Sequence, residues 1–353
     1  MEIKIANPGK FIDTDRFSEQ LRSKAIDLEK KTILITRFNE TEQEKDLTEP
    51  PNCSGYGRIR HFKVDSGDGW IQNPLPILPA SKALNLPVDE TIRAQVFQNA
   101  ICNWRCWYCF VDFKLLSANK KYSKFFTCDE LIELYLEQKN PPLVIDLTGG
   151  QPDLVPEWIP WMMRALISRG LNKKIFLWSD DNLGNDYLWE YVSEEDLDLM
   201  STYDMYARVC CFKGIDANSF AINTRAEPAL FDRQFELCSR LLNLGINLYC
   251  YLTMPAPTNT DFDTAIKKLL DRLQDIDENL PLRIVPLRIF EFTPTKGRMS
   301  DFHRDLLKGQ FLALNAWLKD LNQRFSIDSL NKPVTEISFQ KGETRSEGNS
   351  WRH

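Results

Sequence analysis

Apolar and polar positions follow two alternating patterns between residue 91 and about residue 298. Short apolar runs with the length of a buried strand are separated by longer segments in which apolar residues recur at helical spacing. Because helices separate the strands, the sequence predicts an α/β fold with parallel strands and right-handed crossovers. Six such units suit an open barrel, and the periodicity alone also allows a doubly wound sheet. The expected strands cover residues 92–101, 143–147, 174–178, 206–212, 247–253 and 282–290.

Helices are expected between these strands and after the last one. Thr127 and Glu130 form a capping-box pattern that starts the first of them. Apolar positions at helical spacing from residue 301 to about 325 predict one long amphipathic helix, followed by a polar, loose tail from Lys341. Pro286 in the last strand indicates an edge or a bulge. The other helices are expected at residues 157–168, 186–199, 229–244 and 261–276.

The first 90 residues are less regular. A helix is expected near residues 17–28 and a strand at 31–36, and the proline-rich segment 73–79 is expected to run extended over the core. Residues 50–62 predict an irregular stretch containing Arg58, Arg60 and His61. Their cationic groups make this stretch a candidate substrate loop, and the plainer interpretation is an exposed loop.

The chain therefore divides into three predicted parts. Residues 1–90 form an N-terminal extension, which is a candidate cover for the barrel mouth. Residues 91–298 form the core, and residues 299–353 form the C-terminal helix and the tail.

Composition narrows the class of protein. The chain has 353 residues, a net charge of −6 and a pI of about 5.4, so binding to bulk nucleic acid is not expected. No apolar run approaches the length of a membrane span, and the first residues lack the apolar segment of a secretory signal. Nine cysteines in such a chain indicate metal binding or burial rather than disulfides. We therefore expect a cytoplasmic protein without a membrane partner.

Three cysteines, Cys102, Cys106 and Cys109, have the spacing C-x3-C-x2-C directly after the first expected core strand. Thiolates are soft ligands, and three of them can hold a four-iron cube that keeps one iron free for a small molecule. A structural zinc site needs four ligands, and no nearby histidine or cysteine supplies the fourth. Three buried structural cysteines would have no reason to gather in one loop.

This motif, with Tyr108 directly before the third cysteine, resembles that of the radical S-adenosylmethionine (SAM) superfamily. The resemblance covers residues 91–298 and implies a partial (β/α)6 TIM-like barrel. It also implies a [4Fe-4S] cluster on the three cysteines and SAM bound to the fourth iron. An electron donor such as flavodoxin or ferredoxin would reduce the cluster, and SAM would be cleaved to a 5′-deoxyadenosyl radical that abstracts hydrogen from a substrate.

Further positions match the same family after the next strands. Gly149, Gly150, Gln151 and Pro152 stand where the family has a Gly-Gly-Glu-Pro turn that contacts the amino group of SAM, with Gln151 replacing the usual Glu. Ser179 is a candidate for SAM contact after the third strand, although a helix cap explains it equally well. Lys213 matches a family lysine that meets the SAM carboxylate, and its plainer interpretation is a surface lysine.

The substrate is open at this level. A small molecule or nucleotide is favoured, because the core is a modest barrel and Arg58, Arg60 and His61 could meet an anion. The alternative is a peptide- or protein-modifying enzyme, including one that installs a glycyl radical. A third hypothesis lies outside enzymes: an iron–sulfur interaction protein without catalysis, which only the change at Gln151 supports.

Overall fold

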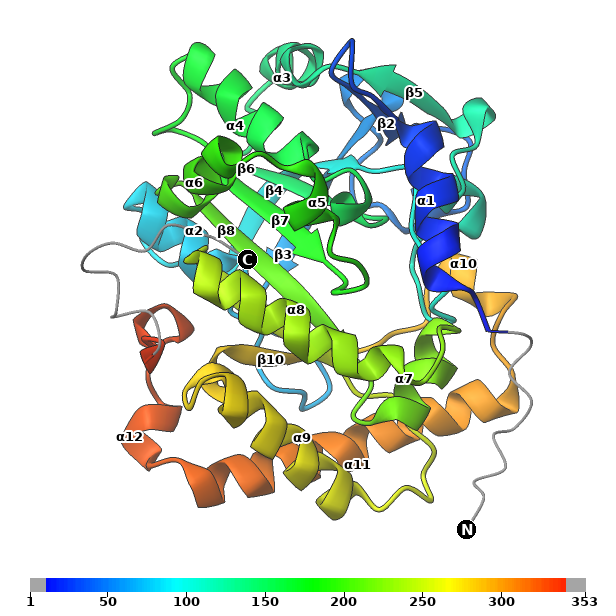
Figure 1. Cartoon of the computed structure of the whole chain (residues 1–353), viewed down its shortest axis with the longest axis vertical. Coiled ribbons are helices and arrows are strands. Elements are labelled where there is room, and N and C mark those ends of the chain that lie inside the picture. Colours follow the sequence, from blue (N-terminus) through cyan, green and yellow to red (C-terminus); the bar gives the residue numbers. More distant parts are fainter. Residues whose placement is uncertain (1–10, 341–353) are drawn as a thin grey trace.

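A curled sheet of seven strands forms the centre of the computed structural model, which describes residues 11–340 (Figure 1). Six strands are parallel, and β3 joins the edge antiparallel to β4. In sheet order the strands are β10 (Ile284–Leu287), β9 (Leu248–Thr253), β8 (Tyr206–Lys213), β7 (Phe176–Asp181), β6 (Val144–Thr148), β4 (Thr91–Gln98) and β3 (Gly57–Lys63). The six predicted strands are confirmed, and β10 with Pro286 is an edge strand.

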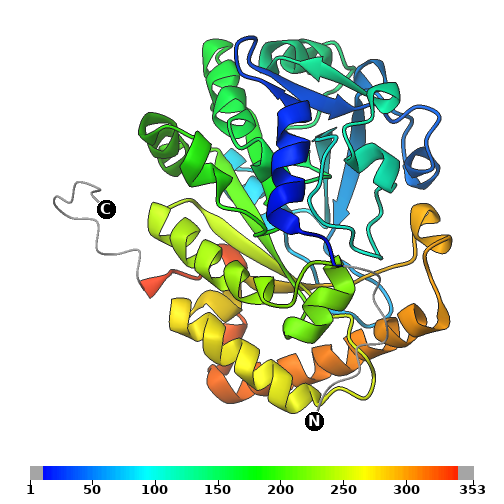
Figure 2. The same ribbon diagram turned by 45° about the vertical axis from the view of Figure 1, so that its right-hand side comes forward.

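Helices follow the parallel strands along the outer side of the sheet, so the fold is an open (β/α)6 barrel (Figure 2). The one helix expected at 186–199 is two helices, because Val192 is extended and the Ser193 side chain caps a new helix. The helix α7 was not expected from the sequence. The bounds are α3 (Cys128–Leu136), α4 (Trp158–Ser168), α5 (Tyr187–Tyr191), α6 (Glu194–Thr202), α7 (Ala217–Thr224), α8 (Leu230–Leu244) and α9 (Phe262–Ile276).

The N-terminal part packs against one edge of the barrel and contains two corrections. The stretch 50–62 was expected to be irregular, but residues 57–63 form β3, with charged side chains on the face that looks into the barrel. The segment 73–79 was expected to be extended, but a helix begins at Ile77. The elements are α1 (Thr14–Ala25), β1 (Ile26–Asp27), β2 (Thr32–Thr36), α2 (Ile77–Leu84) and β5 (Ser123–Phe126), of which β1, β2 and β5 form a small antiparallel sheet.

The C-terminal part packs below the barrel in Figure 1, where the long helix α11 lies against α9. Its elements are α10 (Thr293–Lys296), α11 (Asp301–Arg324) and α12 (Ile327–Leu330), so the helix predicted near 301–325 is confirmed. The polar tail predicted from Lys341 lies outside the described residues. Short 3₁₀ helices are η1 (Gln43–Asp46), η2 (Cys53–Gly55), η3 (Phe113–Leu116), η4 (Lys120–Tyr122), η5 (Pro152–Leu154), η6 (Leu280–Arg283) and η7 (Val334–Glu336). Within residues 11–340, no helix combines the length and apolar character needed to cross a bilayer.

The open side of the barrel lies between the edge strands β3 and β10, and the segment after β3 bridges it. The indole nitrogen of Trp70 donates to the carbonyl of Pro286 at 2.9 Å. From the other edge, the Arg288 guanidinium donates to the carbonyls of Ser66 and Gly67 at 3.0 and 2.7 Å. The predicted division at residues 90 and 298 stays a prediction, and β3, from before residue 90, shares the central sheet.

Candidate active site

A cavity of about 390 Å³ opens at the carboxyl ends of the parallel strands, the place where barrel enzymes carry their chemistry. Most of the residues predicted for the site line it together, although they come from distant parts of the chain. They are Arg60, His61, Cys102, Cys106, Tyr108, Cys109, Gly149, Gly150, Gln151 and Lys213. Three of the predicted residues, Arg58, Pro152 and Ser179, lie behind its walls.

The loop that carries the cysteines is held by α7. The backbone N–H groups of Arg105 and Trp107 donate to the carbonyls of Thr224 and Asn223, at 3.1 and 3.3 Å. The Trp107 indole also donates to the Asn223 side chain at 2.9 Å, and Asn223 donates onward to the Pro255 carbonyl. Asn223 is fully buried, so this contact positions the middle of the cysteine loop. Asn223 was not singled out from the sequence, because no local pattern places it beside the loop.

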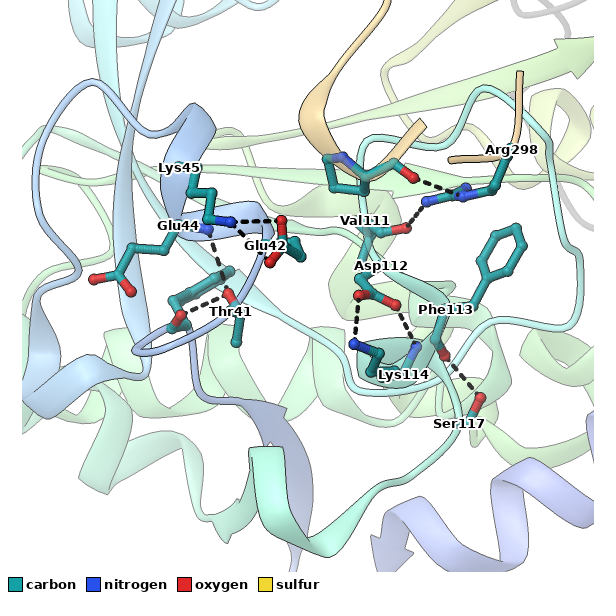
Figure 3. Close-up of polar contacts among 12 residues, drawn as sticks. Thr41, Glu42, Glu44, Lys45, Val111, Asp112, Phe113, Lys114, Ser117 and Arg298 are labelled. Atoms are coloured by element: carbon teal, nitrogen blue, oxygen red, sulfur yellow. Dashed lines mark hydrogen bonds and ion pairs between the residues drawn. The ribbon is translucent and has the colours of Figure 1, made fainter. Parts of the chain in front are cut away.

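Two arginines hold the ends of the same loop. Arg105 donates to the carbonyls of Cys102 and Trp104 at 2.6 and 2.8 Å. Arg298 donates to the Val111 carbonyl at 3.1 Å and lies 4.0 Å from the centre of the Phe113 ring (Figure 3). Both guanidinium groups bring positive charge near the cysteines, which favours their thiolate forms.

The three cysteines are ligands of the kind that would hold an iron–sulfur cube. Burial raises the pKa of the Cys102, Cys106 and Cys109 thiols, while nearby cations, including Lys213, oppose that effect. Bound metal supplies the further positive charge that deprotonates such thiols. Across the described range, no three histidine, cysteine or acidic side chains converge on one ion position. In a four-iron cube each cysteine binds a different iron, so its three ligands need no such convergence.

The Gly149–Gly150 turn packs directly against the chain that enters the cysteine loop. Gly150 has a φ of +83°, and a Cβ there would lie 2.4 Å from the Asn99 carbonyl oxygen and 2.5 Å from that of Ile101. The backbone N–H of Gln151 donates to the same Ile101 carbonyl at 2.8 Å. Only glycine therefore allows this approach, which keeps a bare backbone face beside the cysteines.

Gln151 is buried and held at both ends of its amide. Its nitrogen donates to the Asp181 carboxylate at 2.8 Å, and its oxygen accepts the backbone N–H of Asn182 at 2.9 Å. A glutamate here would set two carboxylates against each other, which explains the amide in this chain. The amide oxygen keeps a second lone pair for a ligand.

Lys213 ends β8 inside the cavity. Its ammonium donates to the Cys211 thiol at 2.9 Å and lies 5.9 Å from the centre of the Tyr108 ring. The Tyr108 hydroxyl is fixed at 2.8 Å from the Thr253 hydroxyl. Lys213 is thus a half-buried cation that lines the cavity rather than an exposed surface lysine.

Ser179 was expected to follow its strand and face the ligand, but it lies within β7. Its hydroxyl is buried and lies 2.8 Å from the Tyr206 hydroxyl. Because side chains alternate along a strand, the next residue, Asp180, faces the cavity instead. The prediction placed the end of this strand too early, and that error selected the wrong neighbour.

The three residues predicted as a cationic loop have different surroundings on β3. Arg60 lines the cavity, whereas Arg58 is buried behind it with only 6% of its surface exposed. His61 also lines the cavity, and its imidazole lies 2.7 Å from the Glu49 carboxylate. β3 therefore delivers Arg60 to the interior of the barrel, which the interpretation as an exposed loop did not foresee.

Comparison with known proteins found a relative in sequence and partial matches in structure. No protein-family model matches the chain. A 7-carboxy-7-deazaguanine synthase of Methanothermobacter thermautotrophicus is 26% identical over 236 residues, which is 60% of this chain and 86% of the synthase. SuiB of Streptococcus suis bound to S-adenosylmethionine matches 51% of this chain with 17% identity and a TM-score of 0.35. SuiB bound to its precursor peptide SuiA matches 61% with 14% identity and the same TM-score. The matches span 37% and 45% of the SuiB chains.

The open barrel, the cysteine loop at the carboxyl ends of its strands and the relationship to the synthase place this chain among the radical SAM enzymes.

Proposed function

We propose that this enzyme cleaves SAM reductively and uses the resulting radical to take a hydrogen atom from a small polar molecule such as a nucleotide or a related heterocycle. The observation that carries the proposal is the shared cavity: the three cysteines, the Gly149–Gly150 turn and charged residues from the barrel interior all line it. A radical formed beside the cysteines would therefore meet a substrate without leaving the protein.

In this proposal, Cys102, Cys106 and Cys109 hold a [4Fe-4S] cluster, which together with SAM supplies one-electron cleavage and the 5′-deoxyadenosyl radical. The chain itself binds and orients SAM. The bare backbone at Gly149–Gly150 and the free lone pair of the Gln151 amide suit its amino group. Lys213 is the half-buried cation of the cavity that suits its carboxylate.

Two observations support a small substrate. A volume of about 390 Å³ lies in the range of small-molecule sites, about 300–1,000 Å³. The related synthase is named for a small, carboxylated guanine-like product. Tyr108, Phe110 and Phe290 also line the cavity and give it apolar walls. A flavodoxin or ferredoxin is the proposed electron donor, and the reducing cytoplasm suits an oxygen-sensitive cluster.

The test is anaerobic reconstitution with iron and sulfide, followed by reduction, addition of SAM and measurement of 5′-deoxyadenosine. The wild-type chain should hold about four irons and form 5′-deoxyadenosine. Cys106→Ala should lose the cluster and the product, because one of three ligands is gone. Cys128→Ala is the matched control, since Cys128 is a buried cysteine of α3 away from the cavity.

The control should keep full iron content and product formation. Normal iron content in Cys106→Ala would remove Cys106 from the cluster. An intact cluster that binds SAM without cleaving it, even with a cell metabolite extract present, would refute the enzymatic function and favour a binding protein.

A further inference from the structure

The floor of the cavity carries charges that neither the cluster nor SAM accounts for. We infer that Arg60 and Asp180, supported by Asp146, form a substrate subsite that binds the lactam edge of a small nitrogen heterocycle, an adjacent carbonyl and ring N–H. The inference rests on the proposed function of the same cavity and specifies its substrate class.

Arg60 supplies the hydrogen-bond donors of this subsite. Its guanidinium lies 3.8 Å from the Asp146 carboxylate and 4.0 Å from the centre of the Phe62 ring. An ion pair at 3.8 Å is too long to be a hydrogen bond, and no side chain within residues 11–340 hydrogen-bonds this guanidinium. Its N–H groups therefore reach the cavity, positioned by Asp146 and Phe62, without a side-chain acceptor among the described residues.

Asp146 is a buried carboxyl on β6 next to Arg60. It is fully buried, and neither carboxylate oxygen has a hydrogen-bond partner among the described residues. It lies two residues before the cavity-lining Thr148 on β6, so both side chains point into the barrel. Burial, then the neighbouring Asp180, raises the pKa of Asp146. Burying a carboxyl without a hydrogen-bond partner costs free energy of folding. We interpret Asp146 as a positioning residue that holds the Arg60 guanidinium at the cavity.

Asp180 supplies the acceptor. One of its oxygens accepts the Thr148 hydroxyl, and the residue lines the same cavity as Arg60. Arg60, Lys213 and Arg58 are the nearby cations that oppose the effect of burial on the pKa of this carboxyl. A donor fork on β3 and an acceptor on β7 thus line the same cavity.

This pairing selects the ligand by charge. A simple carboxylate would gain from Arg60 but would be repelled by Asp180. A lactam edge satisfies both groups, because its carbonyl accepts from Arg60 while its ring N–H donates to Asp180. Phe62, Tyr251 and Phe290 line the same cavity, which suits a flat ring. The guanine-like product of the related synthase carries such an edge.

The experiment measures binding to the reconstituted, SAM-loaded enzyme by anaerobic calorimetry. The probes are 7-deazaguanine, its N1-methyl derivative, benzoate as a plain anion, and phenylalanine as a zwitterion. We expect 7-deazaguanine to bind and N1-methylation to weaken it at least tenfold, about 1.4 kcal/mol, the scale of one hydrogen bond to a charged group. Because this comparison uses wild-type protein, it does not depend on the folding of a variant.

Arg60→Gln and Asp180→Asn should each weaken binding of 7-deazaguanine at least tenfold. Arg93→Gln is the matched control, because Arg93 is on β4 with a side chain that is 41% exposed and does not line the cavity. It should bind like wild type.

The subsite would be refuted if 7-deazaguanine did not bind, or if its N1-methyl derivative bound equally well. It would also be refuted if benzoate or phenylalanine bound more tightly than 7-deazaguanine and lost affinity to the same extent in Arg60→Gln and Asp180→Asn. If the wild-type enzyme did not cleave SAM, the proposed function would be refuted instead. Failure of the subsite and failure of the proposed function therefore give different results.

Discussion

Replacing Gly150 by alanine tests whether the turn beside the cysteines depends on a bare backbone. The left-handed φ of +83° alone costs about 1–2 kcal/mol in a residue with a Cβ. The added Cβ would also lie within 2.5 Å of two carbonyl oxygens, those of Asn99 and Ile101, so the backbone must shift. We expect a total loss of about 3 kcal/mol in unfolding free energy, from strain and displacement together.

Gly170→Ala separates the two contributions. Gly170 ends α4 with a φ of +64°, and a Cβ there would meet nothing within 4 Å. This variant should lose about 1 kcal/mol and keep its affinity for SAM. Urea unfolding of both variants gives the stability difference, and calorimetry on the reconstituted proteins gives SAM affinity. Gly150→Ala should bind SAM at least tenfold more weakly.

Equal stability losses in the two variants would show that the carbonyls beside Gly150 move at no cost. Unchanged SAM affinity in Gly150→Ala would remove this turn from the SAM site, even if the protein were destabilised.

Three further predictions follow from other contacts. Gln151→Glu, which restores the residue usual in the family, should lower stability by about 2 kcal/mol at pH 8, because the new carboxylate faces Asp181. Urea unfolding should show the loss shrinking at pH 5, because the introduced carboxyl is buried and takes up a proton more readily there. An equal loss at both pH values would contradict the repulsion. Asn223→Leu should lower iron content after reconstitution, because the Trp107 indole loses its acceptor and the cysteine loop loosens. Wild-type iron content would show that the backbone contacts suffice. Burial raises the pKa of Asp180. The cations Arg60, Lys213 and Arg58 and the hydrogen bond from the Thr148 hydroxyl oppose this rise, and Asp146 is the neighbouring acid. Because the ligand N–H needs the ionised carboxylate, 7-deazaguanine affinity should fall as pH drops through this raised pKa, beginning above the ordinary value of 3.8. Calorimetry across pH should show a flat profile in Asp180→Asn, and the same fall in that variant would assign the titration to another group.

The local patterns predicted the barrel because its signals are short in range. The alternation of six apolar runs with amphipathic helices depends only on neighbouring residues, as does the spacing of Cys102, Cys106 and Cys109. The edge position of β10 also followed from Pro286 alone, since proline lacks the N–H that a central strand needs. The sequence pattern did not predict β3, because its inward positions carry Arg58 and Arg60 rather than the apolar residues expected on the buried face of a strand.

The chain by itself determined the class of chemistry: three cysteines in one loop, and a glycine turn and a lysine after later strands, specify what they can bind before any folding is considered. Only the tertiary structure decided which charges line the cavity and which lie buried beside it. Asp146, Asp180 and Arg60 come from three strands, and Asn223 reaches the cysteine loop from a helix more than a hundred residues later. Contacts of that kind depend on strand register and on the face of the sheet that each side chain takes. A shift of one residue, as at Ser179, exchanges a buried position for one that lines the cavity.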